Sequence, residues 1–196
     1  MGKAPKDPPH TIEQWRENLD ATAFSSGMEK IDRYIKEQAK REMKNRVSLV
    51  FVLTEPESSI VRGFYSLSAL AVKFADLPAK LQKRLPKYQQ VGATLLGRLG
   101  VDRSYKAELQ ERLGENPRLG EFLFVDAQKR ALEGATETVG SALLVIDVLM
   151  PTEEELDAGV RDPMKFYTEY GFLPFPGNDR RVFKPMRTIE EEYGQA

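Results

Sequence analysis

The chain has 196 residues, of which 41% are hydrophobic, and it contains no cysteine. This length suits one hydrophobic core, and the lack of cysteine excludes disulfides, zinc–thiolate sites and cysteine nucleophiles. The formal net charge of −1 excludes binding to nucleic acid through bulk positive charge, although local basic patches remain open.

The two ends of the chain are polar. The charged, proline-rich start predicts a disordered tail over residues 1–10, with His10 as a tail residue and not a ligand or base. We expect one domain over residues 11–189 and an acidic, fraying tail over residues 190–196. No apolar run reaches the roughly 20 residues that cross a bilayer, and no signal-peptide core occurs. We therefore expect a cytoplasmic protein without membrane contact.

The first half predicts two helices followed by a hairpin. Spacing of apolar residues predicts a short helix over Thr11–Asp20, and Ser26 with Glu29 predicts a capping box before a second helix. Val47–Leu53 and Ile60–Ser68 read as paired buried strands. A short helix over Asp76–Lys87 carries four basic residues, which form either a solvated face or a patch for a polyanion: Lys80, Lys83, Arg84 and Lys87.

The second half is organised around Thr94–Leu132, which predicts a strand, a long polar loop and a helix beginning at Arg118. A loop that enters a helix at a glycine directs backbone N–H groups and the positive end of the helix dipole towards an anion, usually phosphate. Beyond it we expect a buried strand over Val139–Leu149 and an acidic helical turn over Thr152–Arg161. A helix over Pro163–Tyr170 should end at Gly171, and two last strands should follow over Leu173–Pro176 and Arg181–Arg187.

Three motifs in this order carry a resemblance: LLGRLGVDRSY, RLGEFLFVDAQKRAL and FYTEYGF. Together they resemble the toxin-type branch of the GNAT superfamily of N-acetyltransferases, over about Phe24 to Ile189. The resemblance implies an α/β fold with a mixed, mostly antiparallel central sheet, splayed between its fourth and fifth strands and covered by helices on both faces. It also implies acetyl-coenzyme A as co-substrate and no metal.

The resemblance assigns the cofactor to two segments. The backbone of Leu99, Gly100 and Val101 would hold the pantetheine arm. A six-residue loop would hold the pyrophosphate. Its pattern in the family is Gln or Arg, then two variable residues, Gly, one variable residue, and Gly or Ala. Here fifteen residues from Lys106 to Gly120 fill that place, with Glu115 at the first position and Arg118 at the first glycine. Either the insertion projects outward and phosphate binding is kept, or the affinity for phosphate falls. The residues that would bind are Asn116, Arg118, Leu119 and Gly120, with Phe166 beside the cofactor.

Tyr167 is the catalytic candidate, because the resemblance implies that a tyrosine at this place gives a proton to the leaving thiolate. Its aromatic neighbours also fit simple packing, and no general base is identified. The acceptor is a primary amine, with the α-amino group of an aminoacyl-tRNA as one alternative and a small-molecule or protein amine as another. Further basic residues for RNA are Lys40, Arg41, Lys44, Arg46, Arg180, Arg181 and Lys184.

The resemblance also implies an antitoxin partner and admits a homodimer. The altered loop leaves a different hypothesis open: a non-enzymatic GNAT-shaped binding or regulatory protein that no longer positions the cofactor.

Overall fold

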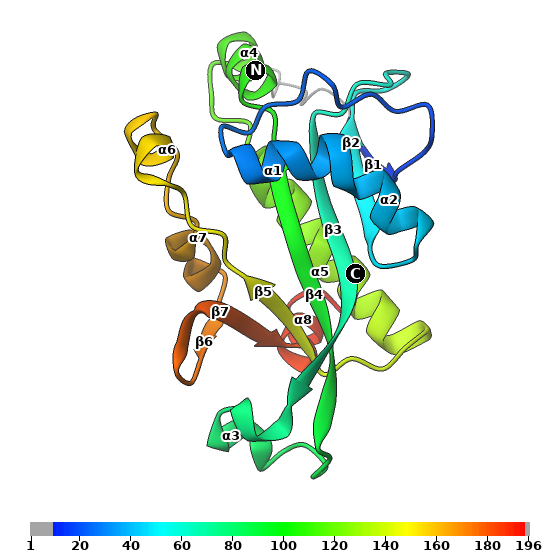
Figure 1. Ribbon diagram of the computed structural model, residues 1–196, viewed down its shortest axis with the longest axis vertical. Coiled ribbons are helices and arrows are strands. Elements are labelled where there is room, and N and C mark those ends of the chain that lie inside the picture. The colour runs from blue at the N-terminus through cyan, green and yellow to red at the C-terminus, as the bar shows by residue number, and fades with distance from the viewer. Residues whose placement is uncertain (1–9, 195–196) are drawn as a thin grey trace, which may run out of the picture. The chain divides into compact units, whose positions relative to one another are not determined.

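A computed structural model describes residues 10–194 of the chain, and the prediction of disorder for residues 1–9 lies outside this part. The strands form one sheet in the order β1-β2-β3-β4-β5-β7-β6 (Figure 1). β4 and β5 are parallel, whereas β1–β2, β5–β7 and β6–β7 are antiparallel pairs. The strands are β1 (Thr11–Gln14), β2 (Leu49–Thr54), β3 (Gly63–Lys73), β4 (Gln90–Val101), β5 (Leu143–Asp147), β6 (Leu173–Phe175) and β7 (Asn178–Pro185). This mixed α/β architecture confirms the predicted fold class.

The described residues fall into two compact units. Residues 10–66 and 98–126 belong to the first, and residues 67–97 and 127–194 to the second. In the described part of the chain, no helix is both long and apolar enough to cross a bilayer.

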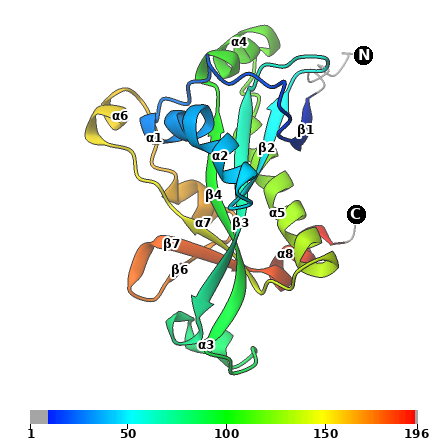
Figure 2. The same ribbon diagram turned by 45° about the vertical axis from the view of Figure 1, so that its right-hand side comes forward.

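The first unit packs helices on both faces of its strands. Figure 2 shows α1 and α2 on one side and the start of α5 on the other. On the α1 side, the Phe64 ring contacts the rings of Phe24 and Tyr34, at centroid distances of 5.4 and 5.9 Å. The helical segments are α1 (Glu29–Arg33), the π-helix η1 (Tyr34–Gln38), α2 (Ala39–Lys44), α4 (Arg103–Leu113) and the first part of α5 (Leu119–Glu137).

The first segment of this unit is a strand, so the prediction of a helix over Thr11–Asp20 is wrong. Thr11–Gln14 pair with Phe51–Thr54 of β2. The backbone bonds to a strand some 40 residues away in sequence, and such a partner is invisible to a local apolar pattern. His10 is not a tail residue either, since its Nε2 and the Tyr105 hydroxyl share a hydrogen bond of 2.8 Å.

The predicted capping box at Ser26 and Glu29 is also absent. The N-cap of α1 is Met28, without a side-chain cap. The Ser26 backbone N–H and hydroxyl instead donate to the Asp32 carboxylate, at 2.7 and 2.6 Å. The helical stretch then passes through a π-helical turn at Tyr34–Gln38.

The polar segment after β4 is a helix and not the expected long loop. Asp102 caps α4 by accepting the Tyr105 backbone N–H at 2.7 Å, and Gly114 ends the helix in the left-handed conformation. Tyr105 and Leu109, one turn apart, are its buried residues. The connection from α4 to α5 is therefore only residues 114–118.

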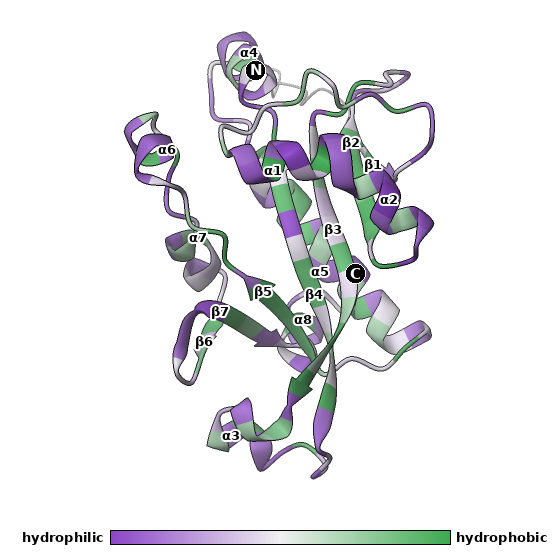
Figure 3. Ribbon diagram, viewed as in Figure 1, coloured by the Kyte–Doolittle hydropathy of each residue, from purple (hydrophilic) through white to green (hydrophobic). Residues whose placement is uncertain are grey.

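The second unit has its own apolar core, to which β3, β4, β5 and β7 contribute. Val72, Leu77, Leu143, Val145 and Phe183 are among its buried members. Figure 3 shows the hydrophobic colouring of β5 and of the adjoining part of β7. Its other elements are the 3-10 helix η2 (Phe74–Asp76), α3 (Ala79–Gln82), α6 (Glu153–Asp157), α7 (Met164–Glu169), α8 (Met186–Tyr193) and the rest of α5.

The acidic segment that was expected to fray from residue 190 is instead helical as far as Tyr193. α8 continues to Tyr193, and Met186 and Ile189 are its buried residues. One turn separates these two side chains, so a single apolar stripe anchors the helix although four of its other positions are charged, namely Arg187, Glu190, Glu191 and Glu192.

Candidate active site

The parallel ladder between β4 and β5 is short. It pairs Ala93–Leu96 with Leu143–Ile146, while β4 continues to Val101. Leu99, Gly100 and Val101 thus lie in the part of β4 beyond this ladder. This is where the resemblance expects the sheet to open.

Gly100 faces α1 at very close range. A Cβ atom at this position would lie 2.6 Å from Cγ2 of Ile31 and 3.3 Å from the rings of Phe24 and Phe64. Because side chains alternate along a strand, Leu99 and Val101 point to the opposite face. Glycine lets α1 pack directly on the β4 backbone.

The start of α5 lies beside Val101. A Cβ atom at Gly120 would meet only Cγ2 of Val101, at 4.0 Å, so the space in front of this glycine is open. The N–H groups of Glu121 and Phe122 donate to the Arg118 carbonyl at 3.0 and 3.1 Å. Leu119 and Gly120 are the first two residues of the helix, and their N–H groups therefore have no acceptor within it.

Arg118 has a backbone conformation that favours glycine. Its φ is +45°, in the left-handed region. This is the position at which the six-residue pattern expects its first glycine. Its guanidinium is 74% exposed and pairs with the Glu121 carboxylate at 3.3 Å. Asn116 is exposed in the same connection.

Phe166 and Tyr167 belong to α7 in the second unit. The helix ends in a Schellman motif, in which the Gly171 N–H donates to the Thr168 carbonyl at 3.0 Å and the Phe172 N–H to the Tyr167 carbonyl at 3.1 Å. Gly171 has a φ of +79°, which explains glycine at the predicted helix end. The sequence therefore located this helix and its end correctly.

The Tyr167 side chain is only 9% exposed. Its ring centroid lies 5.5 Å from that of Phe166 and 6.4 Å from that of Phe172. Burial raises the pKa of Tyr167 to about 12, because the apolar surroundings disfavour the phenolate. The phenol is thus protonated at every physiological pH.

Two residues predicted as cationic surface have other partners. Lys184 is 1% exposed and interacts with Glu192. Arg181 donates two hydrogen bonds to the Asp147 carboxylate, at 2.5 and 2.7 Å. That hydrogen-bonded partner raises the pKa of Arg181. The sequence analysis missed the burial of Lys184, although this lysine stands in a largely apolar stretch, VFKPM.

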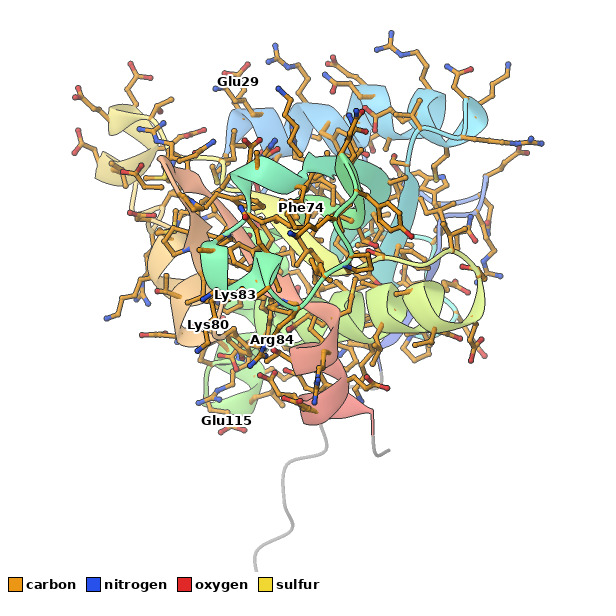
Figure 4. All side chains as sticks on the ribbon, turned by 90° about the horizontal axis from the view of Figure 1, so that it is seen from below. Glu29, Phe74, Lys80, Lys83, Arg84 and Glu115 are labelled. Carbon is orange, nitrogen blue, oxygen red and sulfur yellow. The ribbon has the colours of Figure 1, made fainter. Side chains whose placement is uncertain are left out.

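The basic residues of the α3 segment remain exposed. Lys80, Lys83, Arg84 and Lys87 all face solvent, as does Tyr88, at 68% exposure. Figure 4 shows Lys80, Lys83 and Arg84 close together on and just after α3. No acidic residue occurs between Asp76 and Asp102. Among residues 10–194, none of the four cations takes part in an ion pair.

Comparison with known proteins identifies the family, although no protein-family model matches the sequence. The "tRNA-acetylating toxin" of Mycobacterium tuberculosis (strain ATCC 25618 / H37Rv) is 31% identical over 130 residues, which cover 66% of this chain and 70% of that protein. The chain belongs to the toxin-type GNAT acetyltransferases. This membership confirms the resemblance and makes the protein an N-acetyltransferase.

Two further similarities extend over nearly the whole acetyltransferase. The "Probable toxin TacT" of Sinorhizobium fredii (strain NBRC 101917 / NGR234) is 29% identical over 175 residues, 89% of this chain and 90% of that one. A solved structure of AtaT complexed with acetyl-methionyl-tRNAfMet has a TM-score of 0.75 at 25% identity, covering 94% of this chain and 99% of AtaT. The GNAT fold therefore accounts for all but the ends of the chain.

Proposed function

We propose that this acetyltransferase transfers the acetyl group of acetyl-coenzyme A to the α-amino group of an aminoacyl-tRNA. The observation that carries the proposal is the 31% identity to a protein named as a tRNA-acetylating toxin. Acetylation of that amine removes the nucleophile needed for peptide bond formation. The chain would therefore act as a toxin that halts translation, restrained by a protein antitoxin.

The start of α5 suits a pyrophosphate. Two N–H groups without a helical acceptor, the positive end of the helix dipole and the open space in front of Gly120 all favour a close anion. The Arg118 guanidinium adds a mobile positive charge, which would exchange the Glu121 carboxylate for phosphate. We assign Asn116, Arg118, Leu119 and Gly120 to this role. The helical conformation of residues 103–113 leaves a short connection, which supports the alternative in which phosphate binding is kept.

The backbone of Leu99–Val101 offers N–H and C=O groups beyond the ladder with β5, and we assign it to the amides of the pantetheine arm. We also assign Phe166 to the cofactor, as the family resemblance implies. Acetyl-coenzyme A supplies an activated acyl group and a thiolate leaving group. The Tyr167 hydroxyl holds its proton at physiological pH and donates it towards the sulfur as the carbon–sulfur bond breaks. The acceptor's α-amino group loses its proton readily near neutrality, so no protein base is required.

The α3 segment is our candidate contact for the tRNA backbone. Its four exposed cations lie within eight residues, without an acidic neighbour in the segment, and Tyr88 presents an aromatic ring beside them. Phosphate contacts from Lys and Arg position a protein on a nucleic acid without reading its sequence. Specificity for the aminoacyl end would then come from elsewhere.

Acetyl transfer to charged tRNA tests the proposal directly. Purified protein would be mixed with radiolabelled acetyl-coenzyme A and either methionyl-tRNA, free methionine methyl ester or a lysine-rich protein. We expect labelled acetyl on the α-amino group of methionyl-tRNA only, and a loss of about 100-fold in kcat for Tyr167→Phe. The size of that loss should be constant from pH 6 to 9, because the phenol does not titrate there.

Tyr170→Phe is the matched control, since it removes a hydroxyl from the C-cap residue of α7 and keeps the backbone carbonyl of that residue. Its rate should stay within twofold of wild type. Label on the free amine or the protein would instead establish the other acceptor class. A total lack of transfer, together with no rise in melting temperature at millimolar acetyl-coenzyme A, would favour the non-enzymatic hypothesis.

A further inference from the structure

A buried lysine contacts the end of the helix that carries Tyr167. Lys184 on β7 is 1% exposed. Burial of a charge is costly unless it is paired and hydrogen-bonded, so its partners show what the charge does. The ammonium donates to the Tyr170 carbonyl at 2.9 Å, lies 3.4 Å from the Gln128 amide oxygen and forms an ion pair with Glu192.

One of these partners is a backbone group at the C-cap of α7. The last carbonyls of a helix carry partial negative charge, and a cation placed there is favourable. α7 has six residues, too few to be stable as an isolated helix, so tertiary contacts must hold it. Lys184 supplies such a contact from the adjoining sheet.

The second route from Lys184 to Tyr167 passes through Phe172. The Lys184 Nζ lies 5.7 Å from the centroid of the Phe172 ring, within the range of a cation–π interaction. Phe172 in turn donates its backbone N–H to the Tyr167 carbonyl and packs its ring against the Tyr167 ring. Lys184 thus contacts the Tyr170 carbonyl and the Phe172 ring, two groups at the C-terminal end of α7.

We infer that Lys184 is a positioning residue for Tyr167: its ammonium holds the Tyr170 carbonyl and the Phe172 ring, and so fixes the direction of the Tyr167 hydroxyl. This inference rests on the proposed role of Tyr167. The competing interpretation is that Lys184 and Glu192 merely stabilise the fold. The two alternatives predict different effects of removing the Glu192 charge. Glu192 pairs with the Lys184 ammonium, whereas the Tyr170 carbonyl is bonded by that ammonium directly.

Steady-state kinetics of acetyl transfer to methionyl-tRNA separates these alternatives. Lys184→Met keeps the volume of the side chain and removes the ammonium. We expect about a tenfold fall in kcat, with the KM for acetyl-coenzyme A within twofold of wild type, as for a misplaced catalytic group. Glu192→Gln leaves the bond to the Tyr170 carbonyl in place and should cost less than threefold. A rise in KM alone would overturn the inference.

A double-mutant cycle shows whether Lys184 acts through Tyr167. In the Tyr167→Phe background, Lys184→Met should cause no further loss, because the hydroxyl that it positions is already gone. The same tenfold loss in both backgrounds would mean that Lys184 acts independently and would overturn the inference. If Tyr167→Phe itself keeps the wild-type rate, the proposed role of Tyr167 fails, which is a separate result.

Fluorine NMR gives a measurement that does not need activity. In protein labelled with 3-fluorotyrosine, the Tyr167 resonance is the one missing from Tyr167→Phe. It should shift or broaden in Lys184→Met and stay in place in Glu192→Gln. An unchanged resonance in Lys184→Met overturns the inference. If Lys184→Met does not fold, Lys184→Gln, which keeps a neutral N–H donor, takes its place with a smaller expected shift.

Discussion

Arg118 shows how a residue can keep a backbone conformation while changing its chemistry. A left-handed φ costs a non-glycine residue about 1–3 kcal/mol relative to glycine. Arg118 keeps this conformation because its carbonyl accepts the N–H groups of Glu121 and Phe122 at the start of α5. The chain therefore carries strain at this position and gains a cation next to two N–H groups.

Substitution of Arg118 separates the strain from the charge. Arg118→Gly and Arg118→Ala both remove the guanidinium and its pair with Glu121, but only glycine relieves the positive φ. We expect the free energy of unfolding of Arg118→Gly to exceed that of Arg118→Ala by about 1 kcal/mol, as measured by urea denaturation. Both variants should bind acetyl-coenzyme A more weakly, and to a similar extent. Equal stability of the two variants would show that the backbone is not strained.

The raised pKa of Tyr167 limits what its proton can do in the proposed mechanism. A thiol ordinarily has a pKa near 8.5, whereas Tyr167 has a pKa of about 12. Full transfer of the proton to a free thiolate is therefore uphill. The phenol helps most as a hydrogen-bond donor while negative charge develops on the sulfur, and this requires an accurately directed hydroxyl. This is the requirement that the inferred positioning role of Lys184 would meet.

At the scale of elements, local patterns succeeded where the element carries its own start and stop signals. The start of α5 and both ends of α7 were predicted to within one residue, since α5 has an apolar pattern from Leu119 onward and α7 is followed by a glycine with positive φ. α4 had comparable signals in Asp102 and Gly114, but only Tyr105 and Leu109 are buried, and its charged sequence suggested a loop. β1 was missed because pairing with β2 decided its conformation.

The candidate site shows the same division. The family motif proposed Tyr167, Gly100 and Gly120 as site residues, and it marked Arg118 as a departure from the pattern. It gave no sign that Lys184 is buried. The contacts of this lysine come from residues elsewhere in the sequence: Gln128, Tyr170, Phe172 and Glu192. Burial of a charged residue depends on tertiary partners that a local pattern does not contain.

The two glycines next to the predicted cofactor site should respond oppositely to alanine. Gly100→Ala places a methyl group 2.6 Å from Ile31 in a packed layer, and we expect a loss of about 1–3 kcal/mol in the free energy of unfolding. Gly120→Ala meets only Val101 at 4.0 Å and improves helix propensity, which should add up to about 1 kcal/mol.

Urea denaturation measures the change in the free energy of unfolding for both variants, with one slope of free energy against urea concentration fitted to all curves. The family pattern admits Gly or Ala at the position of Gly120, so Gly120→Ala should keep acetyl-coenzyme A binding within about threefold of wild type. Unchanged stability of Gly100→Ala would mean that α1 can move away from β4. The close packing of these two elements would then be no reason for glycine.

At the scale of the whole molecule, the formal net charge of −1 and the pI near 6.0 mean that the proposed tRNA contact requires a local basic patch. The triple variant Lys80→Gln, Lys83→Gln, Arg84→Gln removes three cations of the α3 segment. A charge-matched variant removes Lys129, Lys165 and Arg187, two of which pair with acids on their own helices. Both variants lower the net charge by three.

Binding of deacylated tRNAfMet between 50 and 200 mM KCl decides between patch and bulk charge. Each phosphate contact contributes about 0.7–0.9 to the slope of log K against log salt, so loss of the α3 cations should reduce that slope by about 2–3. The charge-matched variant should keep the wild-type slope, because its cations are scattered or already paired. Equal losses in the two variants would mean that total charge governs the affinity. An unchanged slope in both would place the tRNA contact away from α3, with the basic residues of α2 as the next to substitute.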